Sequence, residues 1–275
     1  MYDLLRCPVC KDSLKKAEKT LVCEKNHCYD IAGNGYVNLL SRNTTAVVHG
    51  DSKEMLTARR NFLNQHFYDI LTNKINEIVM NITKNIDNPV IIDCCCGEGY
   101  YIKNMSAFMK NHEKNARFLA YDISKKAVGM AAKRNEPITY FVASTFNVPV
   151  EDESIDVALN CFAPFCDFET KRILKKGGYL IGILPGKRHL WQLKELLYNE
   201  PYENDEEGFK TKFLEHSEDI NITSTIHLSS YLDIKDLFLM TPYFWRTPPA
   251  AALKIYSVKE MDLDIDFVIK IYKKV

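Results

Sequence analysis

The sequence predicts an α/β fold with a doubly wound, largely parallel sheet, preceded by a small metal-binding unit. Three observations lead to this prediction. Short apolar runs alternate with helical patterns from about residue 86 onward. The first of these runs ends in an acid that is followed by Gly-x-Gly. Four of the nine cysteines lie in the first 30 residues. Strands and helices in regular alternation are typical of a parallel sheet with helices on both faces.

The alternation follows a helical segment. From residue 52 to residue 83, apolar side chains recur at steps of three and four, as on an amphipathic helix. The strands expected after it cover residues 89–94, 118–121, 138–142, 155–161 and 179–184, and the helices cover residues 100–111 and 124–134. The tail, residues 255–275, alternates apolar and polar residues, which predicts antiparallel strands at the sheet edge.

The composition and the net charge limit the classes of protein to which the chain can belong. The 275 residues suit one large domain with a small appendage, and 46% of them are hydrophobic. No apolar run reaches the roughly 18 residues of a membrane helix, and the N-terminus has no apolar core of signal-peptide length. We therefore expect a cytoplasmic protein with no membrane partner. The net charge of zero argues mildly against nucleic acid as a partner, although a local basic patch would suffice for binding.

The cysteines near the N-terminus have the spacing of a zinc site. Cys7 and Cys10 form a CxxC turn, Cys23 follows after 12 intervening residues, and His27 and Cys28 come close behind. Tetrahedral Zn(II) needs four nitrogen or sulfur ligands, and a unit of about 40 residues has too little core to fold unaided. We predict a structural zinc site with either His27 or Cys28 as the fourth ligand. The alternatives are redox chemistry at CxxC and simple burial of the thiols.

These patterns divide the chain into three parts. Residues 1–40 form the zinc-binding unit, residues 41–85 a linker and helical segment, and residues 86–275 the α/β domain. The polar stretch 41–51 lacks periodicity, which is typical of a linker.

The loop after the first predicted strand has the form of a nucleotide-type cofactor loop. Asp93 ends the strand, and Gly97 and Gly99 flank Glu98 where the helix begins. Glycines allow the backbone to approach a ligand closely, and a helix N-terminus favours an anionic group. Asp122, at the end of the second strand, is placed to bind a ribose diol. A strand, turn and helix without any ligand is the alternative.

The sequence of this loop indicates which of two cofactors it binds, a dinucleotide or S-adenosyl-L-methionine. A dinucleotide fingerprint requires a third glycine three residues after the second, where this chain has Ile102. The pattern D-x-x-x-G-x-G resembles instead the first motif of Rossmann-like S-adenosyl-L-methionine (SAM) methyltransferases. That motif usually has a glycine where this chain has Cys95. Because cysteine is small, we expect the loop to form, with a side chain accommodated in its first turn.

Several longer segments, taken together, are similar to one family. They are CPVC with CEKNHCYDIAGNGYVNLL, GDSKEMLTARRNFL, DCCCGEGYY, KKGGYLI, PGKRHLWQLKELLYNE and MTPYFWR. In this order and beside a zinc knuckle, they resemble the bacterial 23S rRNA (guanine-N1)-methyltransferases of the RlmA type over nearly the whole chain. The resemblance implies a zinc-binding domain on a Rossmann-like class I methyltransferase domain, often a homodimer, that methylates a guanine in a hairpin loop of 23S rRNA.

The resemblance also implies roles for individual residues. The zinc ligands fall on Cys7, Cys10, Cys23 and His27. The contacts to the methyl donor fall on Tyr68, Gly97, Glu98 and His189, with Asp122 as the ribose-binding acid. Without the resemblance, Tyr68 would be interpreted as a core aromatic residue and His189 as a surface residue at the start of a helix.

Guanine N1 carries a proton at neutral pH, so its methylation needs a base or a coordinated loss of that proton. The sequence indicates no unambiguous base. Asn160, at the end of the fourth strand, could hydrogen-bond to the base edge, and Phe162 or Phe165 could stack on the base. Each of them could equally be core packing.

Four basic residues are hypothetical phosphate contacts: Arg59, Arg60, Lys187 and Arg188. Charge reversal of the first two is expected to weaken RNA binding with little effect on cofactor binding. Two other functions stay open at this point. The neutral charge is compatible with a methyltransferase for a small molecule or protein, and Cys95 with a non-enzymatic zinc-containing RNA-binding protein that has a degenerate cofactor loop.

Overall fold

The computed structural model describes residues 2–40, 51–134 and 136–275. Its strands are β1 (Lys15–Ala17), β2 (Thr20–Val22), β3 (Cys28–Asp30), β4 (Val37–Asn38), β5 (Val90–Cys94), β6 (Arg117–Asp122), β7 (Ile138–Val142), β8 (Ile155–Cys161), β9 (Leu174–Pro185), β10 (Glu215–Leu228) and β11 (Met261–Lys273). Its helices are α1 (Lys53–Asn64), α2 (Asp69–Thr83), α3 (Tyr100–Asn111), α4 (Lys125–Ala132), α5 (Asp167–Ile173), α6 (Trp191–Leu197), α7 (Tyr231–Met240), α8 (Tyr243–Arg246) and α9 (Pro249–Ala252), with a 3₁₀ helix at Leu253–Ser257.

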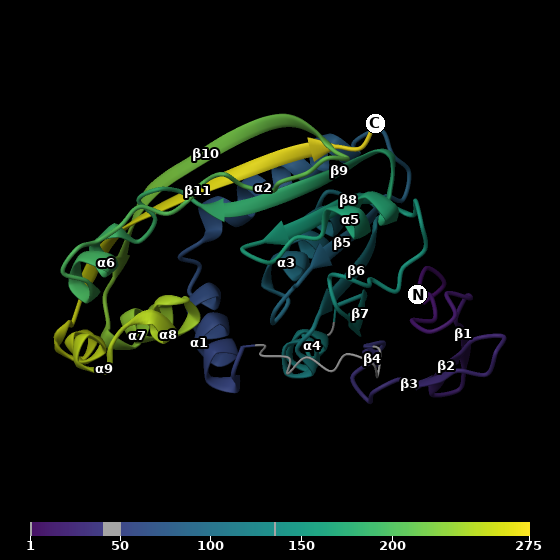
Figure 1. Ribbon diagram of the computed structural model, residues 1–275, viewed down its shortest axis with the longest axis horizontal. Helices are drawn as coiled ribbons and strands as arrows, with labels where there is room; N and C mark the ends of the chain where they lie inside the picture. Colours follow the sequence, from purple (N-terminus) through teal and green to yellow (C-terminus); the bar gives the residue numbers. More distant parts are fainter. Residues whose placement is uncertain (1, 41–50, 135) are drawn as a thin grey trace.

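One large sheet forms the centre of the molecule (Figure 1). Its strand order is β10-β11-β9-β8-β5-β6-β7-β4, and the strands from β9 to β4 are parallel. β5 and β7 are buried at every position, as expected of parallel strands covered on both faces. The sheet is therefore the doubly wound sheet that the alternation predicted.

Different elements pack on the two faces of the sheet. Buried apolar residues of α2, α3 and α4 pack on one face. The other face is covered by α5, by residues 209–214 and by the N-terminal unit, whose Leu5 and Leu21 are completely buried there. The zinc-binding unit therefore shares a hydrophobic core with the large domain.

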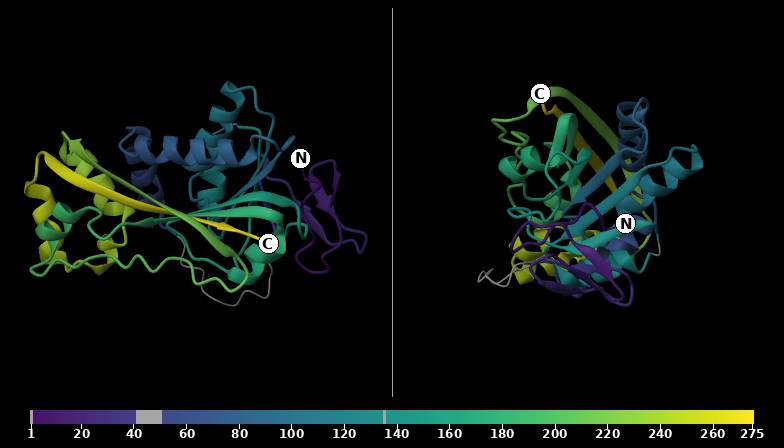
Figure 2. Two further views of the ribbon diagram at one scale, coloured as in Figure 1. Left: turned by 90° about the horizontal axis from the view of Figure 1, so that it is seen from above. Right: turned by 90° about the vertical axis from the view of Figure 1, so that its right-hand side faces the viewer.

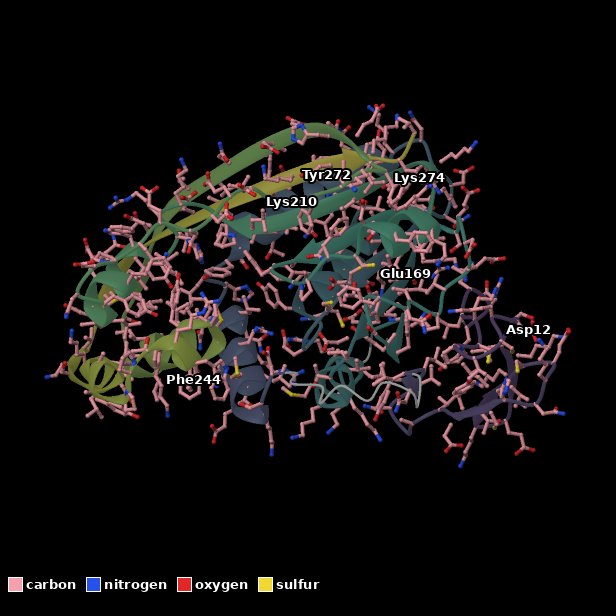
Figure 3. The ribbon with its side chains drawn as sticks, viewed as in Figure 1. Asp12, Glu169, Lys210, Phe244, Tyr272 and Lys274 are labelled. Atoms are coloured by element: carbon pink, nitrogen blue, oxygen red, sulfur yellow. The ribbon has the colours of Figure 1, made fainter. Side chains whose placement is uncertain are left out.

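The N-terminal unit is also joined to the large domain by backbone pairing. Val37 of β4 pairs with Phe141 of β7, and Leu5 bridges to Val150. β4 is thus a strand of the main sheet, although it lies within residues 1–40, the range predicted for the zinc-binding unit. Figure 2 shows this unit at one end of the molecule and α7–α9 at the other. The labelled side chains of Asp12 and Phe244 mark these two ends (Figure 3).

Three regions differ in detail from the expectations. The helical segment is two helices, separated by a turn in which His66 has φ 67°. The tail forms β11, which lies between β9 and β10 rather than at the edge. The edge strand is β10, which was not predicted because most of its side chains are exposed. The predicted linker residues 41–50 lie outside the described residues, and none of the described helices is long and apolar enough to span a membrane.

Candidate active site and metal centre

The predicted zinc ligands converge on one point. One ligand atom each of Cys7, Cys10, Cys23 and His27 lies within 4.8 Å of the others. The Sγ atoms of Cys10 and Cys23 are 3.5 Å apart, and His27 Nδ1 lies 3.3 Å from Cys23 Sγ. Cys28 is exposed on β3 and is not part of this cluster. Three thiols and one imidazole nitrogen at these separations fit tetrahedral Zn(II), so the donor set favours His27 over Cys28.

The zinc knuckle contacts a loop of the large domain. Lys11 Nζ donates a hydrogen bond to Asn147 Oδ1 at 2.5 Å, and the Arg6 N–H donates to the Pro149 carbonyl at 2.9 Å. Asn147 directly follows the wall residues Ser144, Thr145 and Phe146 of the main cavity. The metal site therefore supports one wall of that cavity.

The main cavity has a volume of about 770 Å³ and opens at the carboxyl ends of the central parallel strands. Ligands of doubly wound folds bind at this edge of the sheet. The predicted site residues on its walls are Tyr68, Asp93, Gly97, Glu98, Asp122, Phe162 and His189. Gly99 and Asn160 are not among them. At Gly99, a Cβ atom would lie 2.8 Å from Ala131 Cβ, so this glycine allows α3 to pack closely on α4.

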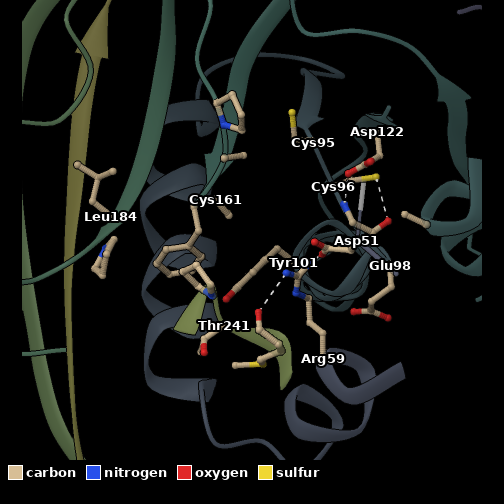
Figure 4. A pocket seen from close by; sticks show the side chains of 18 of the residues that line it. Asp51, Arg59, Cys95, Cys96, Glu98, Tyr101, Asp122, Cys161, Leu184 and Thr241 are labelled. Carbon is tan, nitrogen blue, oxygen red and sulfur yellow. Dashed lines mark hydrogen bonds and ion pairs between the residues drawn. The ribbon is translucent and has the colours of Figure 1, made fainter. Parts of the chain in front are cut away.

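The cofactor loop forms despite its cysteines. Gly97 and Cys95 both have positive φ, at 56° and 61°. Cys95 thus adopts the left-handed conformation at the position where SAM methyltransferases usually have glycine. The Gly97 N–H donates to Asp122 Oδ2 at 2.9 Å, which fixes the loop against the end of β6 (Figure 4). The loop therefore has an open, cofactor-type geometry at the cost of one strained residue.

Asp93 is almost completely buried below this loop. Its Oδ2 has no hydrogen-bond partner in the part of the chain that the structure describes. Burial, and secondarily the nearby Asp122, raises the pKa of Asp93 to about 8. A buried carboxyl oxygen without a donor is costly unless a ligand satisfies it. Asp93 therefore fits a cationic group of a bound ligand, such as the ammonium group of SAM.

The two arginines of α1 have partners inside the protein. Arg60 Nε donates to Glu98 Oε2 at 3.0 Å, and Arg134 also pairs with this carboxylate. Arg59 Nη1 lies 2.5 Å from Asp51 Oδ2 on the cavity wall. Both guanidinium groups thus have a carboxylate partner within the protein, and Arg60 in addition holds Glu98 of the cofactor loop. Phosphate contacts by Arg59 and Arg60 stay a prediction. Because Arg60 contacts Glu98, charge reversal of Arg60 is expected to weaken cofactor binding as well.

Tyr68 and His189 meet on the cavity wall from distant parts of the chain. Tyr68 Oη lies 3.3 Å from His189 Nε2, and the Asp266 N–H donates to His189 Nδ1 at 3.2 Å. Burial lowers the pKa of His189 to about 3, so its ring is neutral near pH 7. The turn at residues 186–188 folds His189 onto β11, which is why a residue that looks like a surface residue in the sequence is buried.

Comparisons with known proteins agree with this geometry. Residues 5–44 match the family model of the RlmA N-terminal zinc ribbon, and residues 91–178 match a methyltransferase domain. A Streptomyces fradiae protein named 23S rRNA (guanine(748)-N(1))-methyltransferase is 33% identical over 70% of this chain and 67% of its own length. The chain belongs to the RlmA-type methyltransferase family.

Two further relatives have related names. "Putative 23S rRNA (guanine-N(1)-)-methyltransferase YxjB" of Bacillus subtilis is 29% identical over 96% of this chain and 95% of its own length. A Micromonospora griseorubida protein with a similar name is 31% identical over 70% of this chain and 69% of its own length. As an RlmA-type methyltransferase, the protein has a class I methyltransferase fold, uses SAM and has a zinc ribbon.

The RlmA-type cavity has a second end that the sequence did not indicate. Its wall residues are Tyr202, Asn204, Asp205, Thr241, Tyr243 and Arg246, which we call the acceptor end. Figure 4 shows Thr241 and Leu184 across the cavity from Asp122 and Glu98. Most of these residues lie in irregular segments or at helix ends, so no local pattern marks them.

The two residues predicted to contact the target base have different positions. Phe162 has φ 56°, is 41% exposed and lines the cavity, so its ring is available for stacking. Asn160 pairs with Cys94 across the sheet, whereas Asp93 pairs with Leu159, so Asn160 and Asp93 point to opposite faces. Asn160 Nδ2 donates to the Pro164 carbonyl at 3.0 Å. The structure thus places Phe162 on the cavity wall and the Asn160 amide against Pro164, which is itself a wall residue.

Proposed function

We propose that this protein transfers the methyl group of SAM to N1 of a guanine in a hairpin loop of 23S rRNA. The main support is one cavity that joins the SAM-type loop to the acceptor end. The names of the relatives point to the same substrate and position on the base. We further propose Tyr68, Asp93, Gly97, Glu98, Asp122 and His189 as cofactor contacts, and Cys7, Cys10, Cys23 and His27 as zinc ligands.

The chemistry is an in-line displacement in which bound SAM supplies an electrophilic methyl group. The protein's main contribution is to hold guanine N1 in line with the methyl carbon and sulfur, an orientation effect of several kcal/mol. Asp122 and Asp93 fix the donor from one side of the cavity. Phe162 offers a ring on which the target base stacks, as aromatic residues commonly do for unpaired bases.

RNA binding requires positive charge near the acceptor end. Lys187 and Arg188 are exposed on the turn just before His189, and the Arg188 guanidinium lies 4.1 Å from the centre of the Trp191 ring. Both cations are therefore available to the phosphates next to the target base. The RNA substrate is also the reason to place the protein in the cytoplasm. We also propose a homodimer, because the family that the sequence resembles often forms one. Sedimentation of the zinc-loaded protein tests this.

Methyl transfer from labelled SAM tests the proposed function. The zinc-loaded protein is incubated with unmodified 23S rRNA and, in parallel, with 16S rRNA and with free guanosine. We expect label in 23S rRNA only. Label in free guanosine or in protein would instead favour a different methyl acceptor. SAM binding without transfer to any of them would contradict the proposal.

A further inference from the structure

The acceptor end of the cavity contains one acid. Five acidic residues line the described cavity walls. Asp51 pairs with Arg59, Glu98 with two arginines, and Asp122 accepts bonds from backbone N–H groups. Asp93 is buried below the cofactor loop. Asp205 remains, and it lines the cavity together with Asn204 and Tyr202.

Asp205 is exposed but its backbone is held in place. Residues 199–211 form no helix or strand, so their position depends on side-chain bonds. Lys194 of α6 is completely buried, and its Nζ donates to the Tyr202 carbonyl and to Asn204 Oδ1, each at 2.7 Å. Asn204 Nδ2 donates to the Gly186 carbonyl at 2.8 Å. Tyr202 and Asn204 are thereby fixed to α6, and Asn204 also to the turn before His189.

The Lys194 ammonium group makes this arrangement unusual. Burial lowers its pKa, and its described hydrogen-bond partners are neutral oxygens, with the Tyr202 ring 4.5 Å away. Burying a cation is costly unless its protons are all satisfied. Through these two bonds, Lys194 ties the irregular segment around Asn204 to α6. The residue presented to the cavity right after Asn204 is Asp205.

We propose that the Asp205 carboxylate binds the N1–H and N2–H edge of the acceptor guanine and takes up the N1 proton. This inference rests on the proposed function. Guanine presents two adjacent N–H donors on that edge, and a carboxylate accepts both, whereas adenine presents a lone pair at N1. In the reaction, guanine N1 forms a bond to the methyl carbon, and the carbon–sulfur bond breaks with its electron pair staying on sulfur. The N1 proton passes to an oxygen of Asp205.

The position of Asp205 suits this role. Its Oδ1 accepts one bond, from the Glu207 N–H at 2.8 Å, and each carboxylate oxygen has more than one acceptor site. The preceding anchored residues hold its backbone before substrate arrives, which is the preorganisation that a base needs. A general base typically contributes a factor of about 100 to 10,000 to the rate.

Single-turnover methylation of a 23S rRNA fragment tests the assignment with the full, zinc-loaded protein. We expect Asp205→Asn to lower the rate by about 100-fold and to leave SAM affinity unchanged. The matched control is Glu200→Gln, an exposed acid of the same region that does not line the cavity; this variant should behave like the unchanged protein. A second readout replaces the mapped target guanine with inosine, which lacks the N2 amino group. The unchanged protein should methylate the inosine RNA more slowly, and Asp205→Asn should not distinguish the two RNAs.

Each outcome decides between the proposals. If Asp205→Asn methylates within about threefold of the unchanged protein, or still prefers guanine over inosine to the same degree, Asp205 is neither the base nor the reader of that edge. Equal losses of SAM affinity and rate would overturn the assignment in favour of a structural role. If the unchanged protein methylates no rRNA, the proposed function fails, and the Asp205 assignment fails with it.

Discussion

Tyr68 Oη and His189 Nε2 lie 3.3 Å apart on the cavity wall, although 121 positions separate the two residues. The Asp266 N–H donates to His189 Nδ1, which places the single proton of the neutral ring on Nε2. Nε2–H therefore donates to Tyr68 Oη. Since Tyr68 lines the cavity, its hydroxyl proton can then be donated to a bound cofactor.

Removing the Tyr68 hydroxyl is expected to weaken SAM binding. A neutral hydrogen bond contributes about 1 kcal/mol, so Tyr68→Phe should raise the dissociation constant about fivefold. Because the two side chains are hydrogen-bonded to each other, the affinity lost on adding His189→Ala to Tyr68→Phe should be smaller than the affinity lost in His189→Ala alone. Calorimetric titration of the four proteins measures this. Tyr272→Phe, a buried tyrosine away from the cavity, serves as control, and fully additive losses would show that the two residues act independently.

Cys95 is predicted to cost stability. Its φ of 61° is strained for a residue with a side chain and not for glycine. Cys95→Gly should therefore raise the free energy of unfolding by up to about 1 kcal/mol and preserve SAM binding. Cys95→Ala keeps a Cβ atom at the same φ and should show no such gain. Urea unfolding compares the two variants, and a glycine variant no more stable than the alanine variant would argue against strain at this position.

Local sequence signals account for most of the central sheet. The strands at residues 138–142 and 155–161 and the helix at 100–111 have the predicted bounds, because apolar runs and the glycine turn are local signals. β10 was not predicted, because an edge strand with one solvated face has no continuous apolar run. The partners of Arg60 and the acceptor end depend on which distant segments meet, and no spacing in the sequence encodes that.

The affinity for SAM should depend on pH through Asp93. In the free protein its pKa is raised to about 8, so the carboxyl group is mostly protonated at pH 7. A cationic ligand group favours the ionised form and lowers that pKa. Affinity should therefore rise as the pH increases from about 6 to about 8, and binding at pH 7 should release a proton. Calorimetry in buffers of different ionisation enthalpy measures that release.

Asp93→Asn isolates the contribution of this carboxyl group. The titration of the ligand's own amino group is the same in both proteins, so the difference between them reports Asp93. We expect the variant to bind SAM more weakly at pH 8 and to release less proton at pH 7. Identical proton release by both proteins would mean that Asp93 does not face the cationic groups of the cofactor.

Removal of the metal is expected to change the wall of the cofactor cavity. The zinc knuckle contacts Asn147, which follows the wall residues 144–146. Chelation should therefore weaken SAM binding, in addition to unfolding the N-terminal unit. Lys11→Met in the zinc-loaded protein should give a smaller loss of affinity, because it removes only the bond to Asn147. Lys15→Met, a change of an exposed lysine in the same unit, is the control. SAM affinity that is insensitive to chelation would contradict this coupling.

The most direct test of the central claim is the chemical identity of the product. Unmodified 23S rRNA is incubated with the zinc-loaded protein and SAM, digested to nucleosides and separated by mass spectrometry against standards of the isomeric methylguanosines. The structure and the family together predict 1-methylguanosine, at one nucleotide, with a reverse-transcription stop at that position. A methyl group on another atom or another base, or no methylation of 23S rRNA by a protein that binds SAM, would contradict the account.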